Sequence, residues 1–511
     1  MLLNITTKGK NITTVTIKEK QQQKQKAKEE PVKTDTQPSR ELRAQTLKNA
    51  SNEGIYTAAK TGTVTNYIAP LAIHLGFSYF VIILLTAIPQ LLGAISQLFV
   101  EKLAHFFKNR YKVLILTGYL EAYTWLPITV IAALTINNPL LLIILVTLDA
   151  IFMNMQSPIW NATLGDVIPE GSVAKYFGRR NIFVGTSGLI STVLAGLLLS
   201  KLTNINAALG FATLFFLGFL FARLAVHYQE KIHDPKPKTT KPDSYSFYQF
   251  IKSVKKNNFG TFTMFLALYK LAVAISTPFF AIYMLRELNF SYLTFTLIIS
   301  GAVLSSVFLT NHWTKIAYHQ GSKKVLKITA LLIPLIPILW ILSTNWKILL
   351  IIELISGALW AGFNISASTF IFEAVNPKQK VKFMAYNNVL AGIGAFIGTM
   401  IGLLISYSNL AIVGSIFITI FLVSGLLRLV VATTFINKIQ EEKVVEINLK
   451  EKTYKRFITI RPKEGVIFEI IGRTKQNTKK EKKQETKKEK NKVLNLPSKG
   501  PFKDKPKYKG K

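Results

Sequence analysis

The chain has no cysteine among its 511 residues, so disulfides, thiolate metal sites and cysteine nucleophiles are all excluded. It also has few acidic residues: 27 Asp and Glu stand against 63 Lys and Arg, which gives a net charge of +36. A balance this basic is typical of a nucleic-acid-binding protein. Yet only 18% of the residues are charged, 49% are hydrophobic, and the mean hydropathy is +0.29. The positions of the basic residues along the chain therefore decide whether they indicate nucleic-acid binding or another class of protein.

The motifs of several enzyme and pump classes are missing as well. The sequence has no Gly-x-x-x-x-Gly-Lys-Ser/Thr phosphate loop, no nucleophile elbow and no His-Glu-x-x-His, and its six histidines show no metal-binding spacing. These absences argue against ATP-driven transport within this chain, against an enzyme, and against a bound cofactor or metal. The first 50 residues are rich in Lys and Gln and lack an apolar core, so we expect no cleavable signal peptide.

Much of the excess charge lies in two tails. Residues 1–50 carry 11 basic and 5 acidic side chains, and residues 438–511 carry 24 and 10. Between them lie apolar runs of about 20 residues, the length that crosses roughly 30 Å of hydrocarbon. This pattern excludes a soluble enzyme or a nucleic-acid-binding domain as the main body. We predict twelve transmembrane helices, near 53–75, 77–100, 112–135, 139–161, 180–201, 205–227, 259–285, 291–313, 325–343, 346–370, 383–407 and 410–437.

The basic residues between the tails predict the orientation. Of these 28 Lys and Arg, 21 lie in alternate connections and three lie in the opposite ones. Because cytoplasmic loops carry the excess of Lys and Arg, both termini should face the cytoplasm. We expect a monomeric multi-pass protein of a prokaryotic plasma membrane. Its basic cytoplasmic face should contact anionic lipids rather than nucleic acid.

Composition divides the chain into two helical halves, a polar cytoplasmic linker and two basic tails. In the second tail, two β-type runs flank a Pro462–Gly465 turn, which predicts a small cytoplasmic hairpin. The expected fold is therefore an all-α membrane protein with one hairpin and otherwise disordered tails. The expected parts are 1–50 (tail), 51–227 (first half), 228–258 (linker), 259–437 (second half) and 438–511 (tail, with the hairpin at 454–472).

The two halves resemble each other in sequence. The run Tyr176-Phe-Gly-Arg-Arg-Asn181 corresponds to Met384-Ala-Tyr-Asn-Asn388, with an offset of 207 between the final asparagines. Lys112-Val-Leu114 likewise corresponds to Lys324-Val-Leu326, at an offset of 212. Two independent matches at nearly one offset indicate the duplication of a six-helix unit. Because each unit has an even number of spans, the two bundles should be related in parallel.

This organisation resembles the major facilitator superfamily of secondary transporters, over roughly residues 53–437. The family's loop signature between spans two and three runs Gly-x-x-x-Asp-Arg-x-Gly-Arg-Arg/Lys. Here the stretch from Glu101 to Lys112 keeps the basic residues but lacks the Asp and the second Gly, and the second copy keeps only Gly321-Ser-Lys-Lys324. The resemblance implies two bundles that rock about a site near the midplane and move a small-molecule solute.

The loop between spans four and five is similar to a charged gating loop of some prokaryotic members. It contains Asp166, Arg179 and Arg180, and Glu373 lies at the corresponding place in the second half. The resemblance implies that these residues lock the cytoplasmic side by charge pairing. The alternative is that they are topology signals and solvated loop charges.

Five ionisable residues inside the predicted spans stand out: Lys60, Glu121, Asp149, Lys270 and Glu353. A charge at bilayer depth costs several kcal/mol unless it is paired or hydrated, so each is a candidate for function. Lys60 and Lys270 are 210 residues apart, close to the repeat offset, and some family members that carry anions resemble this arrangement. The two lysines are therefore candidates for binding an anionic substrate. The alternative is that Glu121 or Asp149 neutralises each lysine in a structural ion pair.

The carboxylates are candidates for proton coupling. Asp149 shares a helical face with Gln156, and Glu353 shares one with Trp360 and Asn364, so these side chains join the candidate site. Desolvation favours the protonated form of a carboxyl, which suits it to carry H⁺. The sequence thus predicts a secondary transporter that works by alternating access. The alternative is a non-transporting membrane scaffold or sensor that recruits partners through its basic tails.

Overall fold

The computed structural model describes residues 40–168, 173–233, 247–253, 258–374, 380–408, 411 and 414–441. The chain divides into two compact units, 1–445 and 446–511, and all described residues belong to the first. The hairpin predicted at 454–472 and most of the second basic tail therefore lie outside the described residues.

The described residues form helices, with no β-strand among them. Their order is α2 (Arg40–Val64), η1 (Thr65–Tyr67), α3 (Ile68–His74), α4 (Tyr79–Ser96), η2 (Gln97–Phe99), α5 (Val100–Phe106), α6 (Arg110–Ala133), α7 (Pro139–Val167), α8 (Val173–Thr203), α9 (Ala207–Glu230), α10 (Phe247–Ser253), α11 (Asn258–Ala274), α12 (Thr277–Ile282), the π-helical turn η3 (Tyr283–Glu287), α13 (Tyr292–Gln320), α14 (Ser322–Leu332), α15 (Leu335–Leu339), α16 (Trp346–Ala374), α17 (Lys380–Ser406) and α18 (Ile416–Phe435).

Ten helical segments in the described ranges are long and apolar enough to cross a membrane, against the twelve predicted. The span expected at 53–75 falls short because α2 is polar and carries Glu53 and Lys60, and a 3-10 turn separates it from α3. The span expected at 325–343 falls short because it is divided into α14 and α15 at Pro334. Proline has no N–H to donate and its ring clashes with the preceding turn, so it kinks or breaks a helix; the helix breaks at Pro334, whereas Pro89, Pro127 and Pro158 lie within continuous helices.

The first helix begins earlier than expected. Helix α2 starts at Arg40, inside the segment predicted as a disordered tail, and runs into the first predicted span without a break. Its early turns are packed against the neighbouring helices: Thr46 and Ala50 are buried, and Asn49 Nδ2 donates a hydrogen bond to the Lys231 carbonyl at 2.9 Å. Residues 40–50 are therefore part of the helical body.

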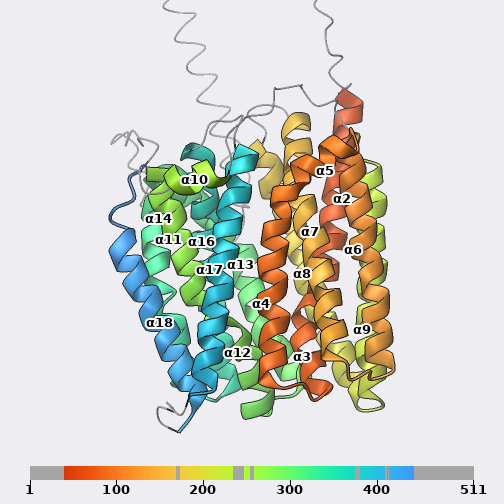
Figure 1. Cartoon of the computed structure of the whole chain (residues 1–511), viewed down its shortest axis with the longest axis vertical. Helices are drawn as coiled ribbons and strands as arrows, with labels where there is room; N and C mark the ends of the chain where they lie inside the picture. Colours follow the sequence, from red (N-terminus) through yellow and green to blue (C-terminus); the bar gives the residue numbers. More distant parts are fainter. Residues whose placement is uncertain are drawn as a thin grey trace, which may run out of the picture. The chain divides into compact units, whose positions relative to one another are not determined.

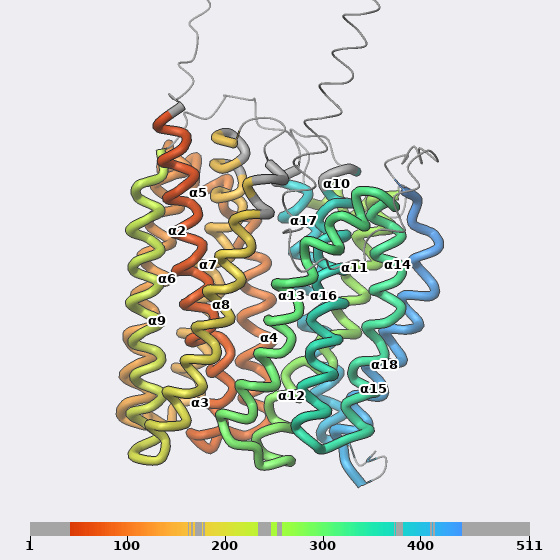
Figure 2. The backbone as a smooth tube through the Cα atoms, turned by 180° about the vertical axis from the view of Figure 1, so that it is seen from behind, coloured from red at the N-terminus to blue at the C-terminus, as the bar shows by residue number. Residues whose placement is uncertain are grey.

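Figure 1 shows the helices in two groups, α2–α9 and α11–α18, and Figure 2 shows the same grouping from behind. In the first group, α2 packs on α8 and α9, α4 on α7, and α6 on α9. In the second group, α13 packs on α16, and α11 packs on α17 and α18. The most extensive contacts between the groups are those of α4 with α17 and of α8 with α13, and α12 also contacts α3 and α4. Helices α4 and α13 correspond to the second span of each repeat, and α8 and α17 correspond to the fifth. Equivalent helices of the two repeats therefore lie at the junction.

Glycines allow the closest approach inside the second group. A Cβ atom added at Gly394 or Gly398 of α17 would lie 2.3 Å or 2.0 Å from the carbonyl oxygens of Ala267 and Leu271 in α11. Any larger residue would force the two helices apart. The glycine-rich character of this span thus serves close helix packing.

The second group also contains a buried arginine at a helix break. Arg428 of α18 is 3% exposed, and its Nη2 donates to Ser276 Oγ at 2.7 Å and to the Val273 carbonyl at 3.3 Å. These acceptors lie where α11 ends and α12 begins. The guanidinium therefore meets the carbonyl end of α11, where the helix dipole favours a cation.

Candidate functional site

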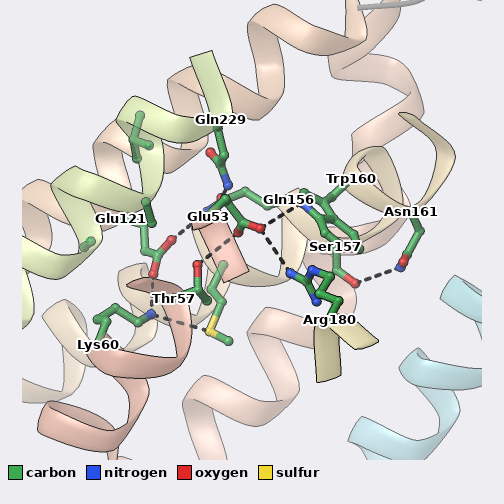
Figure 3. A pocket seen from close by; sticks show the side chains of 14 residues that line it. Glu53, Thr57, Lys60, Glu121, Gln156, Ser157, Trp160, Asn161, Arg180 and Gln229 are labelled. Carbon is green, nitrogen blue, oxygen red and sulfur yellow. Dashed lines mark hydrogen bonds and ion pairs between the residues drawn. The ribbon is translucent and has the colours of Figure 1, made fainter. Parts of the chain in front are cut away.

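A cavity of about 250 Å³ lies among α2, α6, α7, α8 and α9, all in the first group of helices (Figure 3). Nine of its 14 lining residues are polar or charged, including two acidic and two basic side chains, and apolar atoms supply the rest of its surface. The lining residues are Glu53, Thr57, Lys60, Glu121, Met153, Gln156, Ser157, Trp160, Asn161, Arg180, Ala222, Ala225, Val226 and Gln229.

One side of the cavity is a chain of polar contacts that starts at Lys60. Lys60 of α2 is 1% exposed and forms an ion pair with Glu121 of α6. Glu121 Oε2 accepts from Gln156 Nε2 at 2.7 Å, and Gln156 Oε1 accepts from Gln229 Nε2 at 3.0 Å. The chain links α2, α6, α7 and α9, so a change at any member affects the position of the others.

A second cluster is centred on Glu53, seven residues before Lys60. Glu53 Oε2 accepts from Arg180 Nη2 at 3.2 Å and from Trp160 Nε1 at 3.1 Å, while Oε1 accepts from Thr57 Oγ1 at 3.0 Å. The Arg180 guanidinium lies 4.4 Å from the centre of the Trp160 ring. Figure 3 shows these side chains converging from α2, α7 and α8. The carboxylate is thereby held by donors from three helices.

Glu53, Thr57 and Gln229 were not among the site residues predicted from the sequence. Glu53 and Thr57 precede Lys60 by seven and three residues, so all three lie on one face of α2, and that spacing was a usable signal. Gln229 gave no such signal, because a polar residue near the end of a predicted span is ordinary. Its role depends on α9 packing against α6, which no local pattern reveals.

Asp149 lies beside the Lys60–Glu121 pair without joining it directly. It is half-buried on α7, close enough to interact electrostatically with Lys60 and Glu121, and the Trp125 side chain lies beside its carboxyl, although Oδ1 makes no hydrogen bond of normal geometry. Met153, one turn further along α7, approaches Lys60 Nζ with its sulfur at 3.9 Å. Lys60 is thus paired with a protein carboxylate, and its role in binding an anion stays a prediction.

The candidates from the second half lie outside this cavity. Lys270 Nζ lies 5.4 Å from the centre of the Trp360 ring, and Glu353 Oε1 accepts from Trp340 Nε1 at 3.1 Å. Asn364 is exposed on α16. The two lysines that the repeat relates therefore have different surroundings.

The gate candidates are only partly described. Arg180 pairs with Glu53, and Arg179 is exposed. Asp166 and Glu373 lie near the ends of α7 and α16, and their side chains fall outside the described part of the structure. A lock between Asp166 and the arginines therefore stays a prediction. Among the described residues, no group of three His, Asp or Glu side chains could hold a metal ion.

Comparison with protein families gives two matches to the Major Facilitator Superfamily model, at residues 54–270 and 259–473. The chain belongs to this superfamily. The two matches each cover one half of the predicted duplication, so the resemblance inferred from topology is confirmed. A search of curated proteins found no significant match.

Several solved structures share the superfamily fold. A mutant of the nucleoside transporter NupG aligns with a TM-score of 0.61 at 16% identity, covering 77% of this chain and all 100% of that one. A bacterial homologue of the human lysosomal transporter Spinster, in an inward-facing and occupied conformation, aligns with a TM-score of 0.56 at 14% identity, covering 78% and 97%. At this identity the likeness shows the fold. The family match and the apolar helices indicate a multi-pass membrane protein of a transporter superfamily.

Proposed function

We propose that this superfamily member is a secondary active transporter that moves a small solute by alternating access. The cavity in the first half is part of the solute path. The observation that carries this proposal is the polar cavity itself, lined by the Lys60–Glu121 and Glu53–Arg180 pairs within an otherwise apolar helical body. Polar groups at this depth are expensive to retain, which supports a functional role.

The cavity offers hydrogen-bonding groups to a solute. Gln229 lines the cavity, and its Oε1 is buried beside Gly118 without a hydrogen-bond partner, so a rotation of the side chain would offer this acceptor to a solute N–H or O–H. Ser157 and Asn161 add polar groups from α7. Gln229 is hydrogen-bonded to Gln156, and Gln156 is hydrogen-bonded to Glu121. A solute that binds Gln229 would therefore also change the positions of Gln156 and Glu121. Binding at the cavity is thereby linked to the contacts that hold α2, α6, α7 and α9 together.

The two six-helix halves, 51–227 and 259–437, move as the rocking units, with both termini on the cytoplasmic side. The distribution of Lys and Arg supports this orientation. The span expected at 53–75 runs through α2, η1 and α3, and the one at 325–343 runs through α14 and α15. They complete the twelve spans as irregular helices whose polar groups are satisfied inside the protein.

A proton is the proposed coupling ion, and Asp149 the residue that carries it. Lys60, Glu121 and Asp149 form a cluster of one cation and two carboxylates, so one added proton makes the cluster neutral. The unpartnered Oδ1 of Asp149 is the available site. Glu353 is the second candidate. Its Oε1 accepts from Trp340, a bond that either protonation state of the carboxyl can accept.

Proteoliposome uptake tests this proposal. A thermal-shift screen of the purified protein against metabolites identifies a solute, because a bound ligand raises the melting temperature. Uptake of that solute should follow an imposed pH gradient, and Asp149→Asn should abolish the dependence on the gradient while solute exchange continues. Glu353→Gln is the matched variant. Gradient-driven uptake that both variants leave unchanged would remove the proton from the proposal.

The scaffold alternative is tested by deleting tails. Removal of 1–39 and 475–511 leaves α2 and every other described helix intact. A transporter should retain uptake after this deletion. A tail-dependent scaffold should lose its function.

A further inference from the structure

The repeated lysines differ in what neutralises them. Lys60 has three carboxylates near it, from Glu53, Glu121 and Asp149. With repeat offsets of 207 to 212, their counterparts fall within 260–265, 328–333 and 356–361, and none of these stretches contains an acidic residue. The second half has therefore kept the lysine, at Lys270, without any of the acids that surround Lys60.

No other acid in the second half takes their place. Residues 259–437 contain three acids, Glu287, Glu353 and Glu373. Glu353 accepts a hydrogen bond from Trp340, and Glu287 lies in the π-helical turn η3. Glu373 lies 13 residues beyond Trp360 on α16, which is about 20 Å along the helix. The described residues give Lys270 no ion pair, and its contact is with the face of the Trp360 ring.

The packing of α11 shows which way Lys270 points. Ala267 and Leu271 contact α17, Tyr269 stacks on Phe363 of α16, and Ala272 contacts Ser424 of α18. At about 100° per residue, Lys270 lies between the α17 and α16 faces and opposite the α18 face. Figures 1 and 2 both place α18 at the outer edge of the second group. Lys270 therefore points inward, toward the first group.

We propose that Lys270, beside the Trp360 ring, binds a negatively charged group of the transported solute. This inference rests on the proposed transport function and names the class of solute. A membrane-depth lysine without a protein carboxylate is satisfied when the solute brings the counter-charge. A single lysine supplies one positive charge, so it balances the charge of a monoanionic group such as a carboxylate. Lys60 does not share this role, because it is already paired with Glu121.

Binding of benzoate to the purified full-length protein tests the site. Benzoate supplies one carboxylate and a ring for Trp360, benzamide is its uncharged counterpart, and inorganic phosphate tests the other source of anionic oxygen. We expect benzoate to raise the melting temperature and to change tryptophan fluorescence, and benzamide to do neither. Lys270→Gln should weaken benzoate binding by about tenfold or more, as expected for a lost hydrogen bond to a charged group. Lys270→Arg should retain binding.

Lys347 provides the matched control. Its Nζ lies 5.9 Å from the centre of the Trp346 ring, so Lys347→Gln removes another lysine–tryptophan contact of the same half. This variant should bind benzoate as the unaltered protein does. Three results would overturn the inference. The Lys270→Gln variant could bind benzoate as tightly as the unaltered protein does, or the unaltered protein could bind benzamide as tightly as benzoate. The third is that the unaltered protein binds neither benzoate nor phosphate. A preference for phosphate would retain the anion site and change the group that it accepts.

Transport separates this inference from the proposed function. If the protein moves an uncharged solute whose KM is unchanged in Lys270→Gln, the anion site is wrong while the transporter stands. If the unaltered protein moves no solute in liposomes, the proposed function itself fails.

Discussion

The two halves of the chain match the same family model, yet their interiors are stabilised by different side chains. The first half holds two buried ion pairs that link helices around a polar cavity. The second half is dominated by aromatic contacts, such as Phe262 on Phe370 with ring centres 4.3 Å apart and Phe280 on Phe421 at 4.6 Å. The two halves thus share a family fold although their buried contacts differ. The polar positions have diverged between the halves.

Cations show the difference most clearly. Lys60 in the first half is paired with a carboxylate, whereas Arg428 in the second half donates to a hydroxyl and a carbonyl at a helix break. Lys270 has an aromatic face beside it. Removing each cation should therefore have a different effect on stability.

The largest effect is expected at Lys60. Lys60→Met leaves Glu121 and Asp149 without their shared cation, and breaking a buried pair in this way costs about 3–5 kcal/mol. The melting temperature in detergent should fall strongly. Glu121→Gln should cost less, because Asp149 remains as a counter-charge for Lys60.

Lys270→Met supplies the control for that comparison. No ion pair of the described residues is broken by this change, so the melting temperature should move much less than in Lys60→Met. Equal losses in the two variants would contradict the view that the halves treat their lysines differently.

Arg428 should come next. Arg428→Met removes donors to Ser276 Oγ and the Val273 carbonyl, and hydrogen bonds from a charged group contribute about 1.5–3 kcal/mol. Unfolding should be easier by that amount, measured by thermal denaturation in detergent. Ser276→Ala, which removes one acceptor and leaves the guanidinium, should cost less. An Arg428→Met protein as stable as the unaltered one would show that the helix break does not need its cation.

Tyr67 tests the junction between the halves. Its hydroxyl lies 3.1 Å from the Thr192 carbonyl in α8 and 2.9 Å from Thr296 Oγ1 in α13. Tyr67→Phe should destabilise the protein by about 1 kcal/mol, the usual net contribution of a hydrogen bond. Thermal unfolding measures the loss, and Thr296→Val should give a similar value because it removes the other partner. Additive losses in the double variant would show that the two groups do not interact.

Topology was predictable from the sequence, because apolar runs and the placement of Lys and Arg are local signals. The irregular spans were not fully predicted: Pro334 was visible, but the polar character of α2 becomes acceptable only once α6, α7, α8 and α9 pack around it. The Lys60–Glu121 pair was foreseen as an alternative. Which of the two lysines would be paired was not foreseen, because the answer depends on which helices face each other.

The residues of the cavity could likewise be predicted only in part from the sequence. Gln156 was a candidate because it follows Asp149 on one helical face, a spacing visible in α7 alone. Its partners Glu121 and Gln229 come from α6 and α9, 35 and 73 residues away. Contacts of that range are fixed by helix packing rather than by any local pattern.

The smallest effect is expected at the exposed ion pair between the halves. Lys382 Nζ lies 3.6 Å from Glu101 Oε2, and the Glu101 side chain is 68% exposed. Water and salt screen such a pair, so Glu101→Gln should change stability by less than about 1 kcal/mol, and the change should shrink further as ionic strength rises. Melting temperatures at low and high salt measure this. A loss at Glu101 as large as that at Lys60, or one that persists in high salt, would mean that charge stabilises the junction as strongly as it stabilises the interior of the first half.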